Sequence, residues 1–153
     1  MARFTKTMRV PYGPDDCLSL VADIRHYPDF IKWITALRVS EEKTAGPGLT
    51  ECLANVVVGF RGFTERFTTR VAIDEPARRV TAALVRGPFR KLFAEWRITE
   101  SVSGASDVSL EIHYEFRNPV ISFLAAANHD LAVDRILNAF LEEARRRYSA
   151  PGI

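Results

Sequence analysis

The residues that could carry out acid–base, nucleophilic or metal chemistry are scattered along this chain of 153 residues. The three histidines are His26, His113 and His129, and none has a cysteine or another histidine at the spacing of metal ligands. No serine lies in a nucleophile elbow, and no glycine-rich loop could hold a phosphate. The sequence therefore predicts a protein that is not an enzyme, with no catalytic residue, no metal site and no cofactor.

A polar interruption lies in an apolar stretch near the C-terminal end. His129 and Asp130 follow a run of apolar residues, and helical spacing places Asp130 near the apolar face, beside Ala126 and Val133. Either the apolar stripe turns toward solvent at this point, or Asp130 faces the polar group of a ligand. The sequence leaves both interpretations open.

A second carboxylate raises the same question. Glu65 lies between Phe63 and Phe67 in a segment that alternates like a strand, so all three share one face. A buried carboxylate without a partner is costly. Glu65 is therefore expected to be paired, protonated or placed at the mouth of a cavity.

Composition narrows the class of protein. The net charge of +2 is small, so non-specific binding to DNA is not expected. Cys17 and Cys52 have no redox or metal-binding spacing and are expected to be core thiols in a reducing compartment. The N-terminal residues lack the apolar core of a signal peptide, and no run of about 18 apolar residues could span a membrane. We expect a cytoplasmic protein, with peripheral contact at the inner membrane.

The element that must position these residues is a long helix predicted from Asn118 to Tyr148. Asn118 can cap the helix and Pro119 fits its first turn. Residues 120–127 are apolar almost all round, whereas the second half has one apolar face. That face consists of Val133, Ile136, Leu137, Phe140, Ala144 and Tyr148.

Charged residues on the second half of this helix are spaced for ion pairs. Glu142 and Arg146, and Glu143 and Arg147, are four residues apart, so the sequence predicts these two pairs. The arginines also suit the negative end of the helix dipole.

The chain before this helix is predicted to be mostly strand. Strands at regular spacing with tight turns favour an antiparallel sheet, and one long helix after them favours a curved sheet wrapped around that helix. We expect an α+β fold in a single domain over residues 1–150. A space between sheet and helix would be a natural ligand cavity, although a filled core would give the same pattern. The seven predicted strands are 4–10, 34–42, 50–60, 63–74, 79–85, 92–100 and 108–116, with a short helix at 16–24 after the first.

Short blocks of sequence resemble the coenzyme Q-binding protein family, which is related to the ribosome association toxins in the START-like, polyketide cyclase/dehydrase superfamily. The resemblance implies the helix-grip fold and a non-enzymatic carrier or chaperone for ubiquinone that supports respiration. An isoprenoid tail would gain ~0.8 kcal/mol for each CH₂ that is buried. The blocks are Tyr27-Pro28-Asp29-Phe30, Phe67-Thr68-Thr69-Arg70, residues 87–92 with Trp96 downstream, and Phe116-Arg117-Asn118-Pro119.

Two other classes of function compete with lipid binding. The same blocks occur in proteins that block the association of ribosomal subunits, so a ribosome is the alternative partner. A cyclase-type enzyme is the third class, and the lack of a convincing acid–base pair counts against it.

The candidate ligand-binding residues are the apolar and aromatic residues expected to face the cavity, together with Asp130. Val133, Leu137 and Phe140 are expected to face the sheet. The full set is Phe30, Trp33, Val56, Phe63, Phe67, Trp96, Tyr114, Phe123, Ala126, Asp130, Val133, Leu137 and Phe140.

The aromatic segment 27–33 is predicted either to plug one end of the sheet or to form the rim of a ligand mouth. In the second interpretation it pairs with residues 120–131 as a movable cover that a membrane surface can displace. Leu124 and Leu131 would then point away from the sheet, toward that cover.

Overall fold

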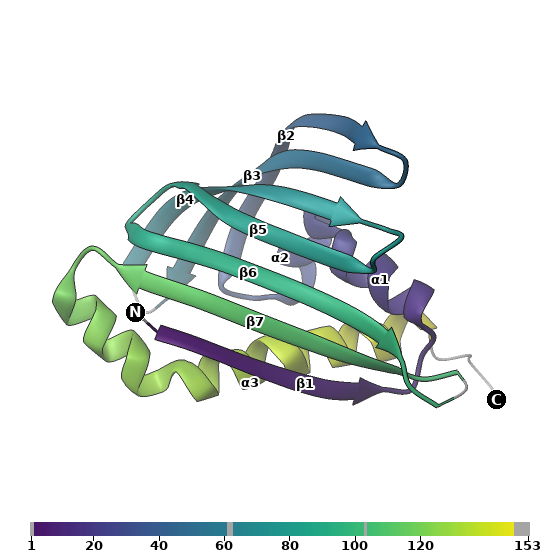
Figure 1. Ribbon diagram of the computed structural model, residues 1–153. Coiled ribbons are helices and arrows are strands. Elements are labelled where there is room, and N and C mark those ends of the chain that lie inside the picture. Colours follow the sequence, from purple (N-terminus) through teal and green to yellow (C-terminus); the bar gives the residue numbers. More distant parts are fainter. Residues whose placement is uncertain (1, 61–62, 103, 149–153) are drawn as a thin grey trace.

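The computed structural model describes residues 2–60, 63–102 and 104–148, and the side chains of these residues other than 2, 60, 63 and 120–132. The described strands form one seven-stranded antiparallel sheet in the order β1-β7-β6-β5-β4-β3-β2, which confirms the predicted fold class (Figure 1). The strands are β1 (Ala2–Val10), β2 (Ile34–Gly46), β3 (Leu49–Phe60), β4 (Phe63–Asp74), β5 (Arg79–Arg86), β6 (Phe89–Glu100) and β7 (Ser106–Phe116).

The helices lie against one face of the sheet, which we call the inner face. The chain runs from β1 at one edge to β2 at the other through α1 (Pro14–Ala22), η1 (Ile24–His26) and α2 (Tyr27–Phe30). The C-terminal helix α3 (Pro119–Tyr148) has 30 residues and runs along the same face (Figure 1). None of the described helices combines the length and hydropathy that crossing a bilayer requires.

Several predicted boundaries were wrong. The first helix begins at Pro14 because proline suits the first helical turn, and it ends at Ala22. β6 begins at Phe89, earlier than predicted, through an irregular register between Phe89 and Lys91. β2 extends past Glu42 to Gly46 because bulges interrupt its pairing with β3 and let the strand continue.

The alternation of apolar residues along the strands was predicted correctly. Cys52, Ala54 and Val56 of β3 are buried, as are Trp96 and Ile98 of β6. Both cysteines are free thiols in the core, as predicted, and burial raises the pKa of each. The buried stripe of α3 includes Val133, Leu137, Phe140 and Ala144, each 5% exposed or less.

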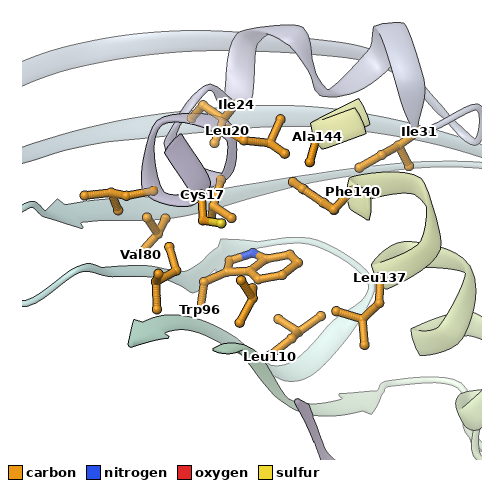
Figure 2. Packing of buried hydrophobic residues seen from close by; sticks show 14 of the residues in the cluster. Cys17, Leu20, Ile24, Ile31, Val80, Trp96, Leu110, Leu137, Phe140 and Ala144 are labelled. Carbon is orange, nitrogen blue, oxygen red and sulfur yellow. The ribbon is translucent and has the colours of Figure 1, made fainter. Parts of the chain in front are cut away.

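Helix α1 closes one end of the inner face. Cys17 and Leu20 of α1 lie with Val80 of β5 and Trp96 of β6, opposite Ala144 of α3, in one cluster of buried side chains (Figure 2). At this end the core is therefore enclosed on three sides, by the sheet, by α1 and by the second half of α3.

Candidate ligand-binding cavity

A cavity of about 260 Å³ lies between the inner face of the sheet and the second half of α3. Its wall is almost entirely apolar, and no charged residue is among the described residues that line it. Strands β2 to β7, residues 24–34 and α3 all contribute to the wall, including Leu37, Val58, Leu92, Leu110, Ile112 and Ile136. Such a space suits a neutral, mainly hydrophobic molecule.

Phe140 fixes α3 against this wall. Its ring lies beside the indole of Trp96 (Figure 2). The Phe140 ring centroid is 4.6 Å from that of Trp96 and 5.1 Å from those of both Tyr27 and Phe30. The contacts with Tyr27 and Phe30 are edge-to-face, which is a favourable arrangement for aromatic rings. Phe140 is therefore part of the packed core and part of the cavity wall at once.

The segment 24–34 forms one side of the cavity through Ile24, Tyr27, Ile31 and Trp33. The Tyr27 hydroxyl donates a hydrogen bond to the carbonyl of Val21, and burial raises the pKa of Tyr27. That hydroxyl is therefore already committed within the protein. The described aromatic partner of this segment in α3 is Phe140, in the second half of the helix. The predicted partner, residues 120–131, has its side chains outside the described residues.

The predicted ligand-binding residues fall into three groups. Those that line the cavity are Trp33, Val56, Phe67, Trp96 and Phe140. Those that are described but do not line it are Phe30, Tyr114, Val133 and Leu137. The side chains of Phe63, Phe123, Ala126 and Asp130, and of the predicted cover residues Leu124 and Leu131, lie outside the described residues.

The predicted residues that do not line the cavity are buried or packed elsewhere. Phe30 packs behind the wall, with its ring against Tyr27 and Phe140. Tyr114 lies toward the end of β7, where its ring centroid is 5.9 Å from that of Phe4. Val133 is 1% exposed and belongs to the filled part of the core. The spacing of apolar residues along strands and helices could not separate these positions from true cavity positions.

A buried threonine in the wall was not singled out from the sequence. Thr69 of β4 is 4% exposed and lies between Phe67 and Val71, which also line the cavity. The signal was its place on the inward face of an alternating strand. Glu65 of the same strand is exposed and pairs in register with the cavity residue Val58, so it lies at the edge of the cavity, as one of the expected alternatives proposed.

The turn between β5 and β6 packs closely on the cavity wall. A Cβ atom on Gly87 would lie 2.6 Å from the Cβ of Phe67, so only glycine fits there without a shift. Phe89, just after this turn, places its ring centroid 5.6 Å from that of Phe67. This glycine and phenylalanine therefore hold Phe67 in the wall, which gives the 87–92 block a physical role.

An ion-pair network ties segment 23–30 to the end of α3. Glu143 is 5% exposed and accepts hydrogen bonds from Arg146 at 2.9 Å and Arg147 at 2.7 Å. Arg147 also donates to Asp23 at 2.9 Å, and His26 lies 2.7 Å from the other Asp23 oxygen.

Neighbouring side chains lower the pKa of both carboxyls. The Arg146 guanidinium, together with Arg147, lowers the pKa of Glu143 to about 2 despite burial. Burial raises the pKa of Asp23, but His26 and Arg147 more than offset this and lower it.

The predicted pairing on α3 was half correct. Glu143 and Arg147 form the expected pair, but Arg146 also bonds to Glu143 and not to Glu142. Glu142 bonds instead to Arg145 at 2.9 Å. The buried Glu143 carboxylate attracts both guanidiniums because it has little solvent to compete with them.

The outer face of the sheet divides into two parts. At one end acids and bases are paired: Glu95 lies 2.5 Å from Arg97 and 3.6 Å from Arg79. At the other end are exposed cations with no ion-pair partner among the described residues, which we call the basic face. It consists of Arg38, Arg66, Arg70, Arg86, Arg90 and Lys91.

A shallow depression of about 490 Å³ adjoins the basic face. Arg90, Lys91, Phe93 and His113 line it, and the rings of Phe93 and His113 meet edge-on at 6.3 Å. Cations beside partly exposed aromatic rings suit a polyanion that also has flat rings. The surrounding described residues contain no group of three or more histidines, cysteines or acids that could hold a metal ion.

Known proteins share sequence with most of this chain. A family model described as polyketide cyclase/dehydrase and lipid transport matches residues 10–141. The ribosome association toxin RatA of Escherichia coli K12 is 29% identical over 150 residues, covering 98% of this chain and 91% of that protein. The mitochondrial coenzyme Q-binding protein coq10 of Schizosaccharomyces pombe is 28% identical over 142 residues, covering 91% and 84%.

Solved structures agree with the fold. An 18 kDa protein from Caulobacter crescentus is 33% identical with a TM-score of 0.83, covering 98% of this chain and all of that one. The Zhui aromatase/cyclase from Streptomyces sp. R1128 has a TM-score of 0.84 at 20% identity, covering 99% and 98%. The latter is evidence for the fold alone.

Proposed function

Because this chain belongs to the polyketide cyclase/dehydrase and lipid transport family, we propose that it binds a hydrophobic small molecule in the cavity between the sheet and α3. Its architecture is the START-like helix-grip fold that the sequence predicts. The observation that carries the proposal is an internal space of about 260 Å³ whose described wall has no charged residue. A space of this kind would be an empty defect in a protein whose core served only stability.

The ligand we propose is ubiquinone or a similar isoprenoid lipid, and the role is that of a carrier or chaperone supporting respiration. Relatives named coenzyme Q-binding proteins support this identity. The cavity volume lies just below the ~300–1,000 Å³ typical of small-molecule sites. It therefore suits a quinone ring with the start of its tail, and the rest of a long tail would have to run beyond the described cavity.

The contact residues we propose are Trp33, Val56, Phe67, Trp96 and Phe140, which line the cavity. The remaining predicted residues keep two roles in this proposal. Phe30, Tyr114, Val133 and Leu137 support the wall from behind, while Phe63, Phe123, Ala126 and Asp130 would meet the tail beyond it.

The proposed protein is not an enzyme and needs no cofactor. The described wall of the cavity has no charged residue and therefore no acid–base pair. One structural neighbour is an aromatase/cyclase, so catalysis is the alternative to binding alone. Turnover of a polyketide substrate would show that this protein is an enzyme. In cells we place the protein in the cytoplasm, with peripheral contact at the inner membrane while segments 27–33 and 120–131 open to admit a lipid.

The chain offers a direct test through its fluorescence. It has two tryptophans, Trp33 and Trp96, and both line the cavity. Titration with a ubiquinone that has one isoprene unit should quench the emission, and Trp33→Phe and Trp96→Phe should each keep part of the quenching. Mass spectrometry of an organic extract of the purified protein should find the natural ligand. If a quinone causes no quenching and the extract holds no lipid, the proposal fails.

Ribosome association is a second candidate, favoured by the basic face. Relatives named ribosome association toxins raise it, and RNA is a polyanion whose contacts with cations weaken as salt rises. Arg70→Glu with Arg86→Glu should abolish co-sedimentation with ribosomal subunits at low salt. Arg9→Glu with Arg135→Glu is the matched control, because it makes the same charge change away from the basic face. Equal loss in both variants, or no co-sedimentation of the wild type, would count against this function.

A further inference from the structure

Two consecutive threonines of β4 face opposite sides of the sheet. Thr68 pairs in register with Asn55 of β3, and Thr69 pairs with Ala54. The register to β5 shifts between them, since Thr68 lies opposite Arg86 and Thr69 opposite Leu84. Both side chains are buried, Thr68 at 5% exposed and Thr69 at 4%.

The two hydroxyls differ in their hydrogen bonds. Thr68 donates to the side-chain oxygen of Asn55 at 3.0 Å, and Asn55 in turn donates to Ser40 at 3.3 Å. The Thr69 hydroxyl has no partner within the described part of the chain. Every fully enclosed polar side-chain atom there does have a partner, so the Thr69 oxygen must reach free space. Because Thr69 lines the cavity, the cavity is that space.

The rest of the wall restricts what this hydroxyl can meet. The Tyr27 hydroxyl is committed to Val21, and the indoles of Trp33 and Trp96 can only donate hydrogen bonds. Thr81 also borders the cavity, but its place in the ladder opposite Glu95 puts its side chain in the outer row. A ligand that satisfies this wall therefore offers an acceptor.

The acceptor must also be uncharged. No described cation lines the cavity, so a carboxylate would enter without an ion-pair partner, which is costly. Glu65, exposed opposite Val58 at the edge of the cavity, would repel an anion further. A ketone or quinone carbonyl meets both requirements, whereas a fatty acid meets only one.

We propose that the Thr69 hydroxyl is the polar anchor of the cavity, donating a hydrogen bond to a carbonyl oxygen of a neutral ligand. This inference rests on the proposed function and adds to it the chemical class of the ligand. Thr69 then makes the protein prefer a carbonyl-bearing molecule over a hydrocarbon of the same shape, as buried hydrogen-bonding groups in binding sites do.

Calorimetry with two matched probes tests the anchor. One probe is trimethyl-prenyl-benzoquinone, and the other is the trimethyl-prenyl-benzene that lacks both carbonyls. Wild type should bind the quinone more tightly. Thr69→Val, which keeps the shape, should weaken quinone binding about 5- to 10-fold, the worth of one hydrogen bond, and change binding of the hydrocarbon less than about 2-fold. Thr69→Ser should retain the preference, and Thr68→Val is the matched control that should not alter it.

The possible failures are distinguishable. If wild type binds neither probe, both the proposed function and the proposed role of Thr69 are wrong. If wild type binds both probes and Thr69→Val leaves their affinity ratio unchanged, only the anchor falls. The anchor would also be overturned if Trp96→Phe lost the preference for the quinone while Thr69→Val kept it, because the indole would then hold the carbonyl.

Discussion

The space between the sheet and α3 is filled at one end and open at the other. At the filled end α1 adds Cys17 and Leu20 to the residues of sheet and helix, and neither of them borders the cavity. At the open end Leu37, Val58 and Leu92 border the cavity, and each is only partly buried. Both ends use the same alternation of apolar residues along the strands. The difference lies in the layer that covers them.

This comparison shows that the openness of a core depends on the covering elements more than on the sheet. A strand fixes which side chains point inward, but it cannot supply the atoms that meet them from the other side. Where α1 and the second half of α3 both cover the sheet, the interior is filled. Residues 24–34 add only a few side chains to the cavity wall, so the space beside them is not filled.

The largest expected effect is at the boundary between the two ends. Phe140→Ala should lower the free energy of unfolding by ~3–5 kcal/mol, because the ring is 3% exposed and contacts Trp96, Tyr27 and Phe30. Urea denaturation would measure the loss. A loss below ~1 kcal/mol would mean that Phe140 belongs to the open end and not to the packed core.

Substituting one leucine at each end should show the difference in packing more clearly. Leu137→Ala removes atoms from the filled part, where Leu137 is 5% exposed, and should cost ~2–4 kcal/mol. Leu92→Ala makes the same chemical change in a partly buried side chain beside existing free space, and should cost only about 1 kcal/mol, since fewer contacts are lost. Equal losses of unfolding free energy in parallel urea titrations would show that the two ends do not differ in packing.

The ion-pair network at the filled end should give a pH dependence. The pKa of Glu143 is lowered to about 2 in the folded protein, so its contribution is complete above the pKa of an unfolded glutamate and is lost as the pH falls toward 2. This contribution is at most about 3 kcal/mol. Glu143→Gln should therefore be less stable than wild type at pH 7, and the difference should shrink between about pH 5 and pH 2.

The neighbouring glutamate is the control for this pH dependence. Glu142 has a side chain that is 71% exposed and pairs with Arg145 at the surface. Such pairs contribute little, so Glu142→Gln should follow the wild-type curve at every pH. A constant difference between Glu143→Gln and wild type from pH 7 to pH 2.5 would show that the carboxylate charge is not what stabilises this end.

Most of the fold could be predicted from local patterns, because each strand alternates and the helix has one apolar face over its second half. Val133, Leu137, Phe140 and Ala144 are buried as the helical spacing predicted. What could not be predicted depends on distant neighbours. The sequence predicted the pair of Glu143 and Arg147, and only the approach of Asp23, 124 residues away along the chain from Arg147, shows the network that this pair belongs to.

The candidate site was predicted in part for the same reason. Trp33, Val56, Phe67, Trp96 and Phe140 line the cavity, but an inward-facing residue borders free space only if no other side chain fills it. Tyr114 faces the aromatic ring of Phe4 instead. A filled core and an open one have the same periodicity, so the position of the cavity could not be derived from the strands alone.

The smallest expected effect concerns two neighbouring hydroxyl groups, one hydrogen-bonded within the protein and one facing the cavity. Thr68→Val removes a donor and leaves the Asn55 oxygen without its 3.0 Å hydrogen bond, so it should cost about 1 kcal/mol. Thr69→Val removes a buried hydroxyl that has no partner within the described residues and replaces it with a methyl group in an apolar wall. In the protein without ligand it should therefore be neutral or stabilising by up to about 1 kcal/mol. Thermal unfolding of both variants, freed of lipid, would measure the sign. If Thr69→Val is as destabilising as Thr68→Val, then its hydroxyl is already satisfied inside the folded protein, and the open end is less open than its wall indicates.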